Sequence, residues 1–456
     1  MPQLLSRENP ASSGPPPVGP MAAPKVPHVA EEELHGDVPA LVARHGGVPL
    51  AELRIAFPLP ERELTSPAAV TVLCPALFAG TERHDRTAFA EALEGLGGHL
   101  DAGVHDDHLF ISGSVLATNL APFLSLVCDM LTVPAYPKNE VRADAARSAD
   151  EALIALAQPE VIARQELRRR LFKGHPYATP MAAPAALRRI SESALRDLHR
   201  SLLTSSTPVV VLVGDLQPAR AKTLLEDSLG PWLDSRKKPI AALAPLPAPK
   251  PGPIEVVARP NAVQSNLRLG GAAPSLSAPD WPAATLAESI AGGMFTSRIV
   301  ANLRERNGYT YTPYTATRHG RAGSYLVTGA DVATEVTAAA LVETLYELGH
   351  LAATGVTPEE LELARHHALG RFSFQVATQS GLASTMVSLA VLGAGTGYLS
   401  SYPKGLLAAT KDDVDGAARR YLAPGRLVTL VVGDPEKVEG QLSLVGAVTV
   451  RKPLAH

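Results

Sequence analysis

The sequence has few cysteines, little charge imbalance and no long apolar run, and each shortage excludes a class of protein. Its only 2 cysteines, Cys74 and Cys128, form no C-x-x-C pair, zinc-ribbon spacing or disulfide framework, which indicates a reduced, cytoplasmic setting. The 42 Lys and Arg nearly balance the 45 Asp and Glu, which argues against partners such as nucleic acid or anionic membranes. The basic run Arg168-Arg169-Arg170 is interpreted as a solvated helix face. All apolar runs are shorter than the ~18 residues needed to span a bilayer.

What the chain does contain is enough apolar sequence for two domains. Its 456 residues are 46% hydrophobic and 19% charged, which is typical of a globular protein with two domains of roughly 200 residues each. The segment 236–253, rich in Pro and Ala, predicts a semi-rigid linker. We therefore expect domains at 31–235 and 254–456. The Pro-, Ser- and Gly-rich segment 1–30 lacks the features of a secretory signal and is expected to be a disordered arm.

The two halves of the chain share one pattern. Segments 209–215 (VVVLVGD) and 427–434 (LVTLVVGD) each follow a predicted helix, form a buried apolar run and end in Gly-Asp. A repeat period of about 220 residues indicates a duplicated domain rather than a repeat array. Helical spacing and strand alternation occur in both halves, so the expected fold class is α+β, with two homologous α/β-sandwich domains. The clearest elements are helices at 89–96, 120–131, 140–156 and from 357, and a strand at 109–115.

Several short motifs occur in a fixed order along the chain. Together they resemble the pitrilysin/insulinase family of zinc peptidases, the inverzincins, over nearly everything from about residue 35 onward. The resemblance implies a clamshell of two bowls that encloses a chamber, and a chain of ~450 residues would supply one bowl. The motifs are Phe78-Ala79-Gly80-Thr81, Leu96-Gly97-Gly98-His99-Leu100-Asp101-Ala102, His175-Pro176-Tyr177, Gly292-Gly293-Met294 and Leu303-Arg304-Glu305-Arg306-Asn307-Gly308-Tyr309-Thr310-Tyr311.

The zinc motif of the family is absent. In the family an H-x-x-E-H helix runs into the F-x-G-T motif, so its two histidines fall on Thr71 and Pro75 and its glutamate on Cys74. Two histidines one helical turn apart hold the zinc, and the glutamate polarises its water. None of the three residues found here can do this. The third ligand of the family would fall on Glu151, which is interpreted as a solvent-facing helix residue or a relic. The resemblance thus implies no cofactor in this chain.

The second half retains a different pair of functional residues. In heterodimeric members of the family, one chain carries the zinc helix and the other contributes an arginine and, seven residues later, a tyrosine. The resemblance places these on Arg304 and Tyr311, with Tyr309 as the rival tyrosine. Arg304 would hold substrate carbonyl groups and Tyr311 would stabilise the oxyanion. We expect a helix that ends at Gly308 and a strand on which Tyr309 and Tyr311 share a face. Residue type alone favours a solvated helix-end residue for Arg304 and a core tyrosine for Tyr311, and only the surrounding motif favours the functional roles.

Other candidate sites are weaker. The segment His105-Asp106-Asp107-His108 has many metal-ligand residues, but we expect the two histidines to point to opposite faces. His366 and His367 diverge by ~100° on a predicted helix, which argues against shared chelation. Cys74 is interpreted as a small buried hydrophobe because we expect Pro75 to break the helix that would present a nucleophile.

The sequence therefore leads to one main functional hypothesis and two alternatives. The main hypothesis is a zinc-free subunit of a heterodimeric metalloendopeptidase that cleaves peptides or leader segments, with a homologous zinc-binding subunit as its partner. The first alternative is a non-catalytic scaffold or peptide-binding protein. The second is an independent hydrolase that uses another site.

Overall fold

The computed structural model describes residues 22–235 and 237–453, so residues 1–21 of the expected arm and Arg236 of the expected linker lie outside the described residues. The first strand begins at Val29, within the segment expected to be disordered. Residues 239–253 contain neither helix nor strand. Within the described ranges, no helix is both long and apolar enough to cross a membrane.

The first half of the chain forms one six-stranded sheet. Its spatial order is β1-β2-β6-β3-β5-β4, and only β2 and β6 run parallel. The alternation predicted at 109–115 is confirmed in β5, whose odd-numbered residues 109–115 are buried. The strands are β1 (Val29–Leu34), β2 (Val38–Arg44), β3 (Leu50–Pro58), β4 (His99–His105), β5 (His108–Leu116) and β6 (Val209–Gly214).

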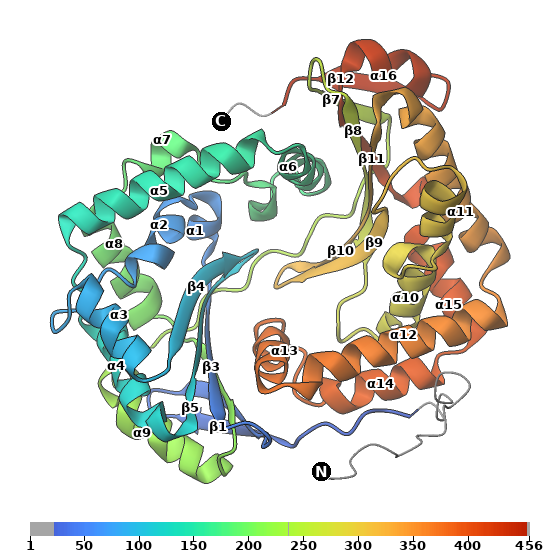
Figure 1. The fold of residues 1–456 in the computed structure, drawn as a ribbon. Helices are drawn as coiled ribbons and strands as arrows, with labels where there is room; N and C mark the ends of the chain where they lie inside the picture. Colours follow the sequence, from blue (N-terminus) through green and yellow to red (C-terminus); the bar gives the residue numbers. More distant parts are fainter. Residues whose placement is uncertain (1–21, 236, 454–456) are drawn as a thin grey trace, which may run out of the picture.

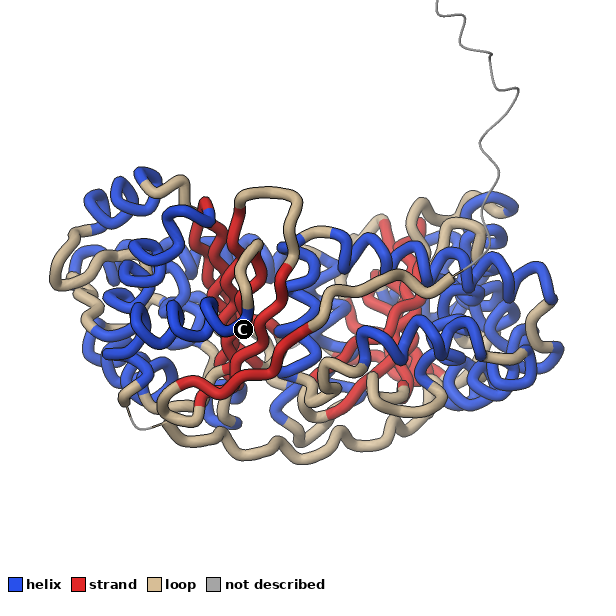
Figure 2. Tube along the Cα trace, turned by 90° about the horizontal axis from the view of Figure 1, so that it is seen from below, coloured by secondary structure: helices blue, strands red, loops and turns tan. Residues whose placement is uncertain are grey.

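The second half repeats this sheet. Its order is β12-β7-β11-β8-β10-β9. The five strands from β7 to β11 pair with one another in the same order and directions as the five strands from β2 to β6. Only the remaining edge strand differs, because β12 is parallel to β7 whereas β1 is antiparallel to β2. The duplicated α+β fold is therefore confirmed, and Figure 2 shows two separate groups of strands, each flanked by helices. The strands are β7 (Ile254–Ala258), β8 (Gln264–Ala273), β9 (Tyr314–Gly320), β10 (Gly323–Ala333), β11 (Val428–Gly433) and β12 (Val448–Arg451).

Helices cover both sheets, and the predicted ones are found at or close to their expected positions (Figure 1). Those of the first half are α1 (Glu61–Thr65), α2 (Ala68–Ala76), α3 (Arg86–Gly95), α4 (Leu120–Thr132), α5 (Lys138–Ala157), α6 (Pro159–Leu171), α7 (Pro184–Leu187), α8 (Glu192–Leu198) and α9 (Pro218–Leu233). Those of the second half are α10 (Trp281–Glu288), α11 (Thr337–Thr354), α12 (Pro358–Ala377), α13 (Gln379–Val391), α14 (Tyr398–Ala408), α15 (Lys411–Ala417) and α16 (Pro435–Leu442). Several helical segments are π-turns, namely η3 (His199–Thr204), η4 (Ser289–Gly293), η5 (Val300–Arg306) and η7 (Ala418–Leu422).

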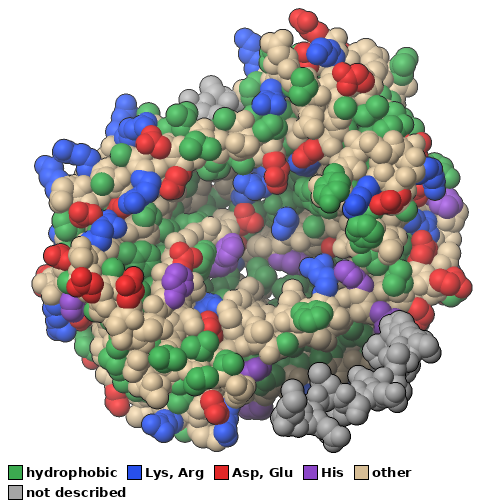
Figure 3. Space-filling model, in the orientation of Figure 1, with side chains coloured by type: hydrophobic (Ala, Val, Ile, Leu, Met, Phe, Trp, Pro, Cys, Tyr) green, Lys and Arg blue, Asp and Glu red, His purple; other side chains and the backbone are tan. Residues whose placement is uncertain are grey.

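Each half also lends one helix to the sheet of the other half. Helix α6 lies on β8 and β11 of the second sheet, and α13 lies on β3 and β6 of the first. Gly270 of β8 permits this contact, because a Cβ there would come within 2.8 Å of Leu171 in α6. On the first sheet, Met386 of α13 belongs to the same apolar cluster as Val211 and Val213 of β6. The halves thus share their cores, and the ring that they form borders a central hollow with histidines and charged side chains around it (Figure 3).

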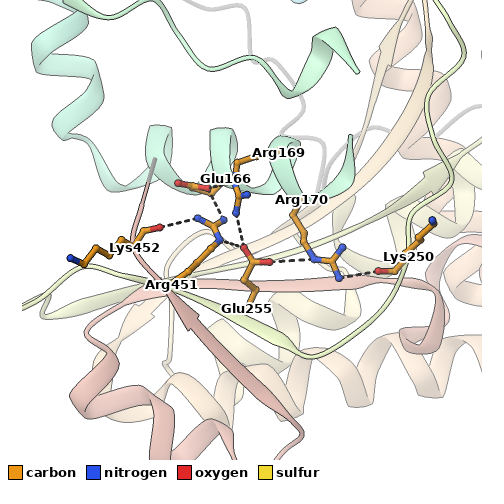
Figure 4. A network of polar contacts seen from close by, with 7 residues as sticks. All are labelled: Glu166, Arg169, Arg170, Lys250, Glu255, Arg451 and Lys452. Carbon is orange, nitrogen blue, oxygen red and sulfur yellow. Dashed lines mark hydrogen bonds and ion pairs between the residues drawn. The ribbon is translucent and has the colours of Figure 1, made fainter. Parts of the chain in front are cut away.

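An ion network joins the exchanged helix α6 to the edge of the second sheet (Figure 4). Glu255 of β7 pairs with Arg169 at 3.0 Å and with Arg170 at 3.3 Å, and it also contacts Arg451 of β12. Arg451 in turn lies 2.6 Å from Glu166. The expectation that the basic run at 168–170 is a solvated face is therefore wrong. Its charges meet carboxylates that are distant in the sequence, and sequence spacing cannot reveal such pairs.

Removing the carboxylate at the centre of this network should weaken the junction of the halves. The change Glu255→Gln leaves three guanidinium groups close together without their shared counter-ion, so we expect the free energy of unfolding in urea to fall by about 2 to 3 kcal/mol. Asp150→Asn is the control, because Asp150 pairs with Arg188 at an exposed site and should cost less than about 0.5 kcal/mol. Equal losses in the two variants would contradict the assigned role of Glu255.

One buried and one partly buried histidine should make the protein less stable in mild acid. Burial lowers the pKa of His199 to about 4, and the ring lies 2.7 Å from the Tyr136 hydroxyl and 2.9 Å from the Leu131 carbonyl oxygen. Burial likewise lowers the pKa of His319 to about 4. An unfolded histidine has a pKa of about 6.5. Between pH 6.5 and 4 the unfolded chain therefore binds more protons than the folded protein, so the free energy of unfolding decreases as the pH decreases.

At pH 5 each of these histidines should reduce the free energy of unfolding by roughly 2 kcal/mol relative to pH 7.5, which urea titrations at the two pH values measure. His319→Phe should remove about half of the difference, whereas His28→Phe, at an exposed position before β1, is the control. A free energy of unfolding that does not change between pH 7.5 and pH 5 would refute the prediction.

Candidate functional site

The helix that would carry the zinc motif is intact but has no zinc ligands. Helix α2 includes Thr71, Cys74 and Pro75. Contrary to expectation, Pro75 does not break the helix: it lies in the last turn, and the helix ends at Ala76. The Thr71 hydroxyl donates to the Pro67 carbonyl oxygen at 2.8 Å and so bonds to its own helix.

The thiol of Cys74 is also unsuited to chemistry. It is 6% exposed and donates to the Val70 carbonyl oxygen at 3.3 Å. Burial, together with the negative charge of Asp101, raises the pKa of this thiol to about 12, so the thiolate nucleophile does not form near neutral pH. The interpretation of Cys74 as a buried hydrophobe is thus supported, although by burial rather than by helix breakage.

The space beside α2 is a cavity with both apolar and charged walls. It has a volume of about 240 Å³, and Leu59, Leu64 and Val70 line it together with Thr71. Glu151 is exposed on the neighbouring helix α5. In the described part of the chain, no three His, Cys, Asp or Glu side chains are grouped so that they could hold a metal ion. The side chains found here therefore do not fit a zinc ion.

The histidines of the segment 105–108 lie at the tip of the β4–β5 hairpin. His105 pairs with His108 across the hairpin, and their ring centroids are 5.4 Å apart, so the expectation that they point to opposite faces is wrong. Two residues opposite each other in an antiparallel pair share a face, which the alternation rule for a single strand does not reveal. The nearby carboxylates are already in use: Asp106 pairs with Arg168 at 2.7 Å, and Asp107 bonds to Tyr177 and to the Arg321 backbone.

The structure brings the two residues predicted to act in the second half into contact. The Arg304 guanidinium carbon lies 4.6 Å from the centre of the Tyr311 ring and 4.7 Å from that of Phe295. The Arg304 guanidinium therefore lies over two aromatic faces, which stabilise a cation and leave the edges of its planar fork available as donors. Its Nε also lies 3.2 Å from a carboxylate oxygen of Glu305.

The backbone around the pair explains this arrangement. Arg304 lies in the π-turn η5, and Gly308 follows with φ +64°, which confirms the predicted left-handed helix end. The strand predicted at Tyr309 and Tyr311 is wrong, because residues 309–313 form a loop and β9 starts at Tyr314. The loop gives the tyrosines different surroundings. Tyr309 packs against the core of the second half, whereas Tyr311 is 76% exposed.

A cavity of about 520 Å³ opens beside this pair. Its walls include Phe295, Arg304 and Tyr311 and, from other parts of the chain, Asp331 and Glu160. Asp331 is fixed by hydrogen bonds from Arg268 at 2.8 Å and Asn266 at 2.7 Å, yet 44% of its side chain stays exposed. The arginine and tyrosine thus face open space together with two carboxylates, which suits the binding of a polar chain such as a peptide.

Sequence reasoning missed several of these wall residues. Phe295 follows the motif at 292–294 directly, so its position could have indicated it. Glu160 and Asp331 come from α6 and β10, and nothing in the sequence connects them with Arg304. His367 also borders this cavity, whereas His366 is exposed, in agreement with the predicted divergence of the two rings.

Comparisons with known proteins agree with this architecture. Residues 189–367 match the family model described as the peptidase M16 inactive domain, a stretch that includes Arg304 and Tyr311. An uncharacterized zinc protease of Mycobacterium tuberculosis is 22% identical over 241 residues, which are 53% of this chain and 55% of that protein. The match thus spans about half the length of this curated relative.

Two solved structures show the same fold. The peptidase M16 inactive domain from Pseudomonas fluorescens has a TM-score of 0.80 and 21% identity, with 89% of this chain and 98% of that chain covered. The periplasmic protease PqqL from Escherichia coli has a TM-score of 0.72 and 16% identity, with 95% of this chain and 49% of that chain covered. The chain therefore has the fold of M16 peptidases and corresponds in extent to about half of the longer one.

Proposed function

We propose that this chain is the zinc-free subunit of a heterodimeric metalloendopeptidase, and that it completes the active site of a homologous partner that carries H-x-x-E-H. Two observations together support the proposal. Helix α2 has lost every zinc-binding side chain, while Arg304 and Tyr311 remain paired beside a cavity. The description of the matched M16 domain as inactive supports the first part.

The proposed chemistry uses only ordinary properties of these two side chains. Hydrolysis of a peptide bond places negative charge on the former carbonyl oxygen, and the exposed Tyr311 hydroxyl, which bonds to no described residue, can donate to that oxygen. Arg304 can donate to the carbonyl groups of an extended peptide and so hold it in register. Zinc in the partner would supply the attacking water.

The assembled enzyme would consist of two bowls. We assign residues 31–235 and 254–456 to two domains of one bowl, joined by the linker at 236–253, and a partner bowl would close the chamber. The longer PqqL chain supports this size, since the present chain covers 49% of it. A closed shell of this kind admits unfolded peptides or leader segments, which could add as a strand to a sheet edge.

A non-catalytic scaffold remains the second candidate, because a chain without metal ligands needs no chemistry of its own. The exposure of Tyr311 favours the peptidase role, since a purely structural tyrosine would normally be buried with a bonded hydroxyl. A native partner that also lacks H-x-x-E-H would favour the scaffold.

The test begins with purification of the native complex and identification of the partner. We expect the isolated chain to cleave no unfolded peptide and to contain no stoichiometric zinc by elemental analysis, whereas the mixture with its partner cleaves. Cleavage by the isolated chain, or a full equivalent of zinc in it, would refute the proposal.

A further inference from the structure

A second cavity of about 520 Å³ lies apart from Arg304 and Tyr311. It is bordered by α10, β9, α12, α13 and α14, and α13 is the exchanged helix that covers the first sheet. The two cavities share one lining residue, His367. Its volume is in the range of sites that take small ligands, about 300 to 1,000 Å³.

Two side chains of opposite charge, Glu288 and Arg371, border this cavity and form no ion pair with each other. Glu288 accepts a hydrogen bond through Oε2 from the Thr317 backbone N–H at 2.9 Å, and the Thr317 side chain also donates to its carboxylate. Arg371 is exposed and forms no hydrogen bond or ion pair within the described residues. Burial raises the pKa of Glu288, and the positive charges of Arg371 and Arg318 oppose that rise. The carboxylate and the guanidinium therefore influence each other across a gap that a ligand could bridge.

Neutral polar groups lie along the same walls. The Ser384 hydroxyl of α13 accepts from Arg54 Nε at 3.4 Å but donates to no described residue, so its proton is available. His367 Nε2 is buried and has no hydrogen-bond partner among the described residues. Burial and the charge of Arg371 lower the pKa of His367, so the ring is neutral at pH 7. A buried polar atom without a partner is costly, and a ligand that bonds to it would remove that cost.

The remaining wall is apolar and rigid. Trp281 and Phe372 are buried, and both pack against Tyr402, with ring centroids 6.4 Å and 5.6 Å away. The Trp281 indole N–H donates to the Tyr398 hydroxyl at 3.0 Å, so its orientation is fixed. Such a wall suits an aliphatic or aromatic side chain.

We propose that this cavity binds the free carboxyl terminus of a short peptide whose last residue is apolar. The terminal carboxylate would lie on Arg371 and the Ser384 hydroxyl, an amide N–H would donate to Glu288, and the last side chain would lie against Trp281 and Phe372. An amino-acid unit carries these three groups together, and the cavity presents a counterpart to each. The choice of a peptide rests on the proposed function, while the site itself is separate from Arg304 and Tyr311.

The experiment uses the full chain without a partner and titrates it calorimetrically with acetyl-Ala-Leu and with its carboxyl-terminal amide. We expect the acid to bind with a dissociation constant of about 1 mM or below, and the amide to bind at least about 10-fold more weakly, because it lacks the charge that Arg371 recognises. Equal affinity for the acid and the amide would overturn the proposal.

Matched variants locate the site. Arg371→Gln should weaken binding of the acid at least about 10-fold. Arg419→Gln should leave it unchanged, because Arg419 is an exposed arginine of η7 that does not line the cavity. Circular dichroism confirms that both variants are folded. Unchanged affinity in folded Arg371→Gln would overturn the assignment.

This test is independent of peptide cleavage. Absence of acid binding by the isolated chain, combined with normal cleavage by the assembled complex, would overturn this inference and leave the proposed function intact. Binding to the isolated chain, combined with a complex that cleaves nothing, would support the carboxylate site and refute the peptidase role.

Discussion

Arg304→Ala and Tyr311→Phe are each expected to slow peptide cleavage by the assembled complex about 100-fold, a loss of roughly 2.7 kcal/mol in transition-state stabilisation. The phenol loses only its hydroxyl, so Tyr311→Phe keeps the ring that stacks on Arg304 while it removes the proposed donor to the oxyanion. Its effect should therefore appear in kcat. Arg304→Ala should also raise KM, because it removes a group that holds the peptide before reaction.

Two neighbouring substitutions control for this prediction. Tyr309→Phe alters the rival tyrosine, which packs against the core, and should leave kcat within about 2-fold. The second control, Arg306→Ala, removes an exposed arginine of η5, the π-turn that also contains Arg304. Arg306 does not line the cavity. A complex in which Tyr309→Phe, but not Tyr311→Phe, loses activity would transfer the role to Tyr309. Full activity in both Arg304→Ala and Tyr311→Phe would reject the site.

Asp107→Ala is expected to be among the most destabilising substitutions, with a loss of about 3 to 5 kcal/mol in the free energy of unfolding. The Asp107 carboxylate is 2% exposed and joins the two halves. It accepts hydrogen bonds from the Tyr177 hydroxyl, from the Arg321 backbone N–H at 2.5 Å and from His108 at 3.1 Å. Alanine would leave these donors without their shared acceptor.

Urea unfolding measures this loss, and Asp106→Ala is the matched control. Asp106 is the adjacent residue, but its side chain is 39% exposed and pairs with Arg168, so its removal should cost less than about 1 kcal/mol. The pKa of Asp107 is lowered by hydrogen bonds from His108 and Tyr177, which outweigh its burial. The Asp107 carboxylate therefore contributes fully to the free energy of unfolding above pH 4, and this contribution is lost as the pH falls further. The free energies of unfolding of the two variants should thus become similar at low pH. Similar losses in both variants at pH 7 would contradict the prediction.

The parts of the fold that depend on local sequence could be predicted well. The strand β5 and the capping box of Thr357 and Glu360 at the start of α12 depend only on residues close together in the sequence, and both are confirmed. The repeated Gly-Asp turns after β6 and β11 likewise indicated the duplication, because each half buries the same kind of strand at its centre.

The features that were missed depend on distant residues. The pattern at 309–311 suits a strand, yet β10 pairs with β9 only from Tyr314 onward, so the preceding residues remain a loop. In the same way His175-Pro176-Tyr177, noted only as a motif, connects the halves. His175 Nε2 lies 2.9 Å from the Ala244 carbonyl oxygen in the linker, and the Tyr177 hydroxyl accepts from the Ala322 N–H at 3.3 Å. No spacing along the chain reveals these contacts.

The exchange of α6 and α13 also has a consequence for biosynthesis. The ribosome completes β6 at Gly214, but the helix that covers the inner face of that sheet begins only at Gln379. Until then, apolar residues such as Val211 and Val213 have no cover on that face and are exposed to chaperones and to aggregation. The first sheet therefore gains this cover only after most of the chain has been translated.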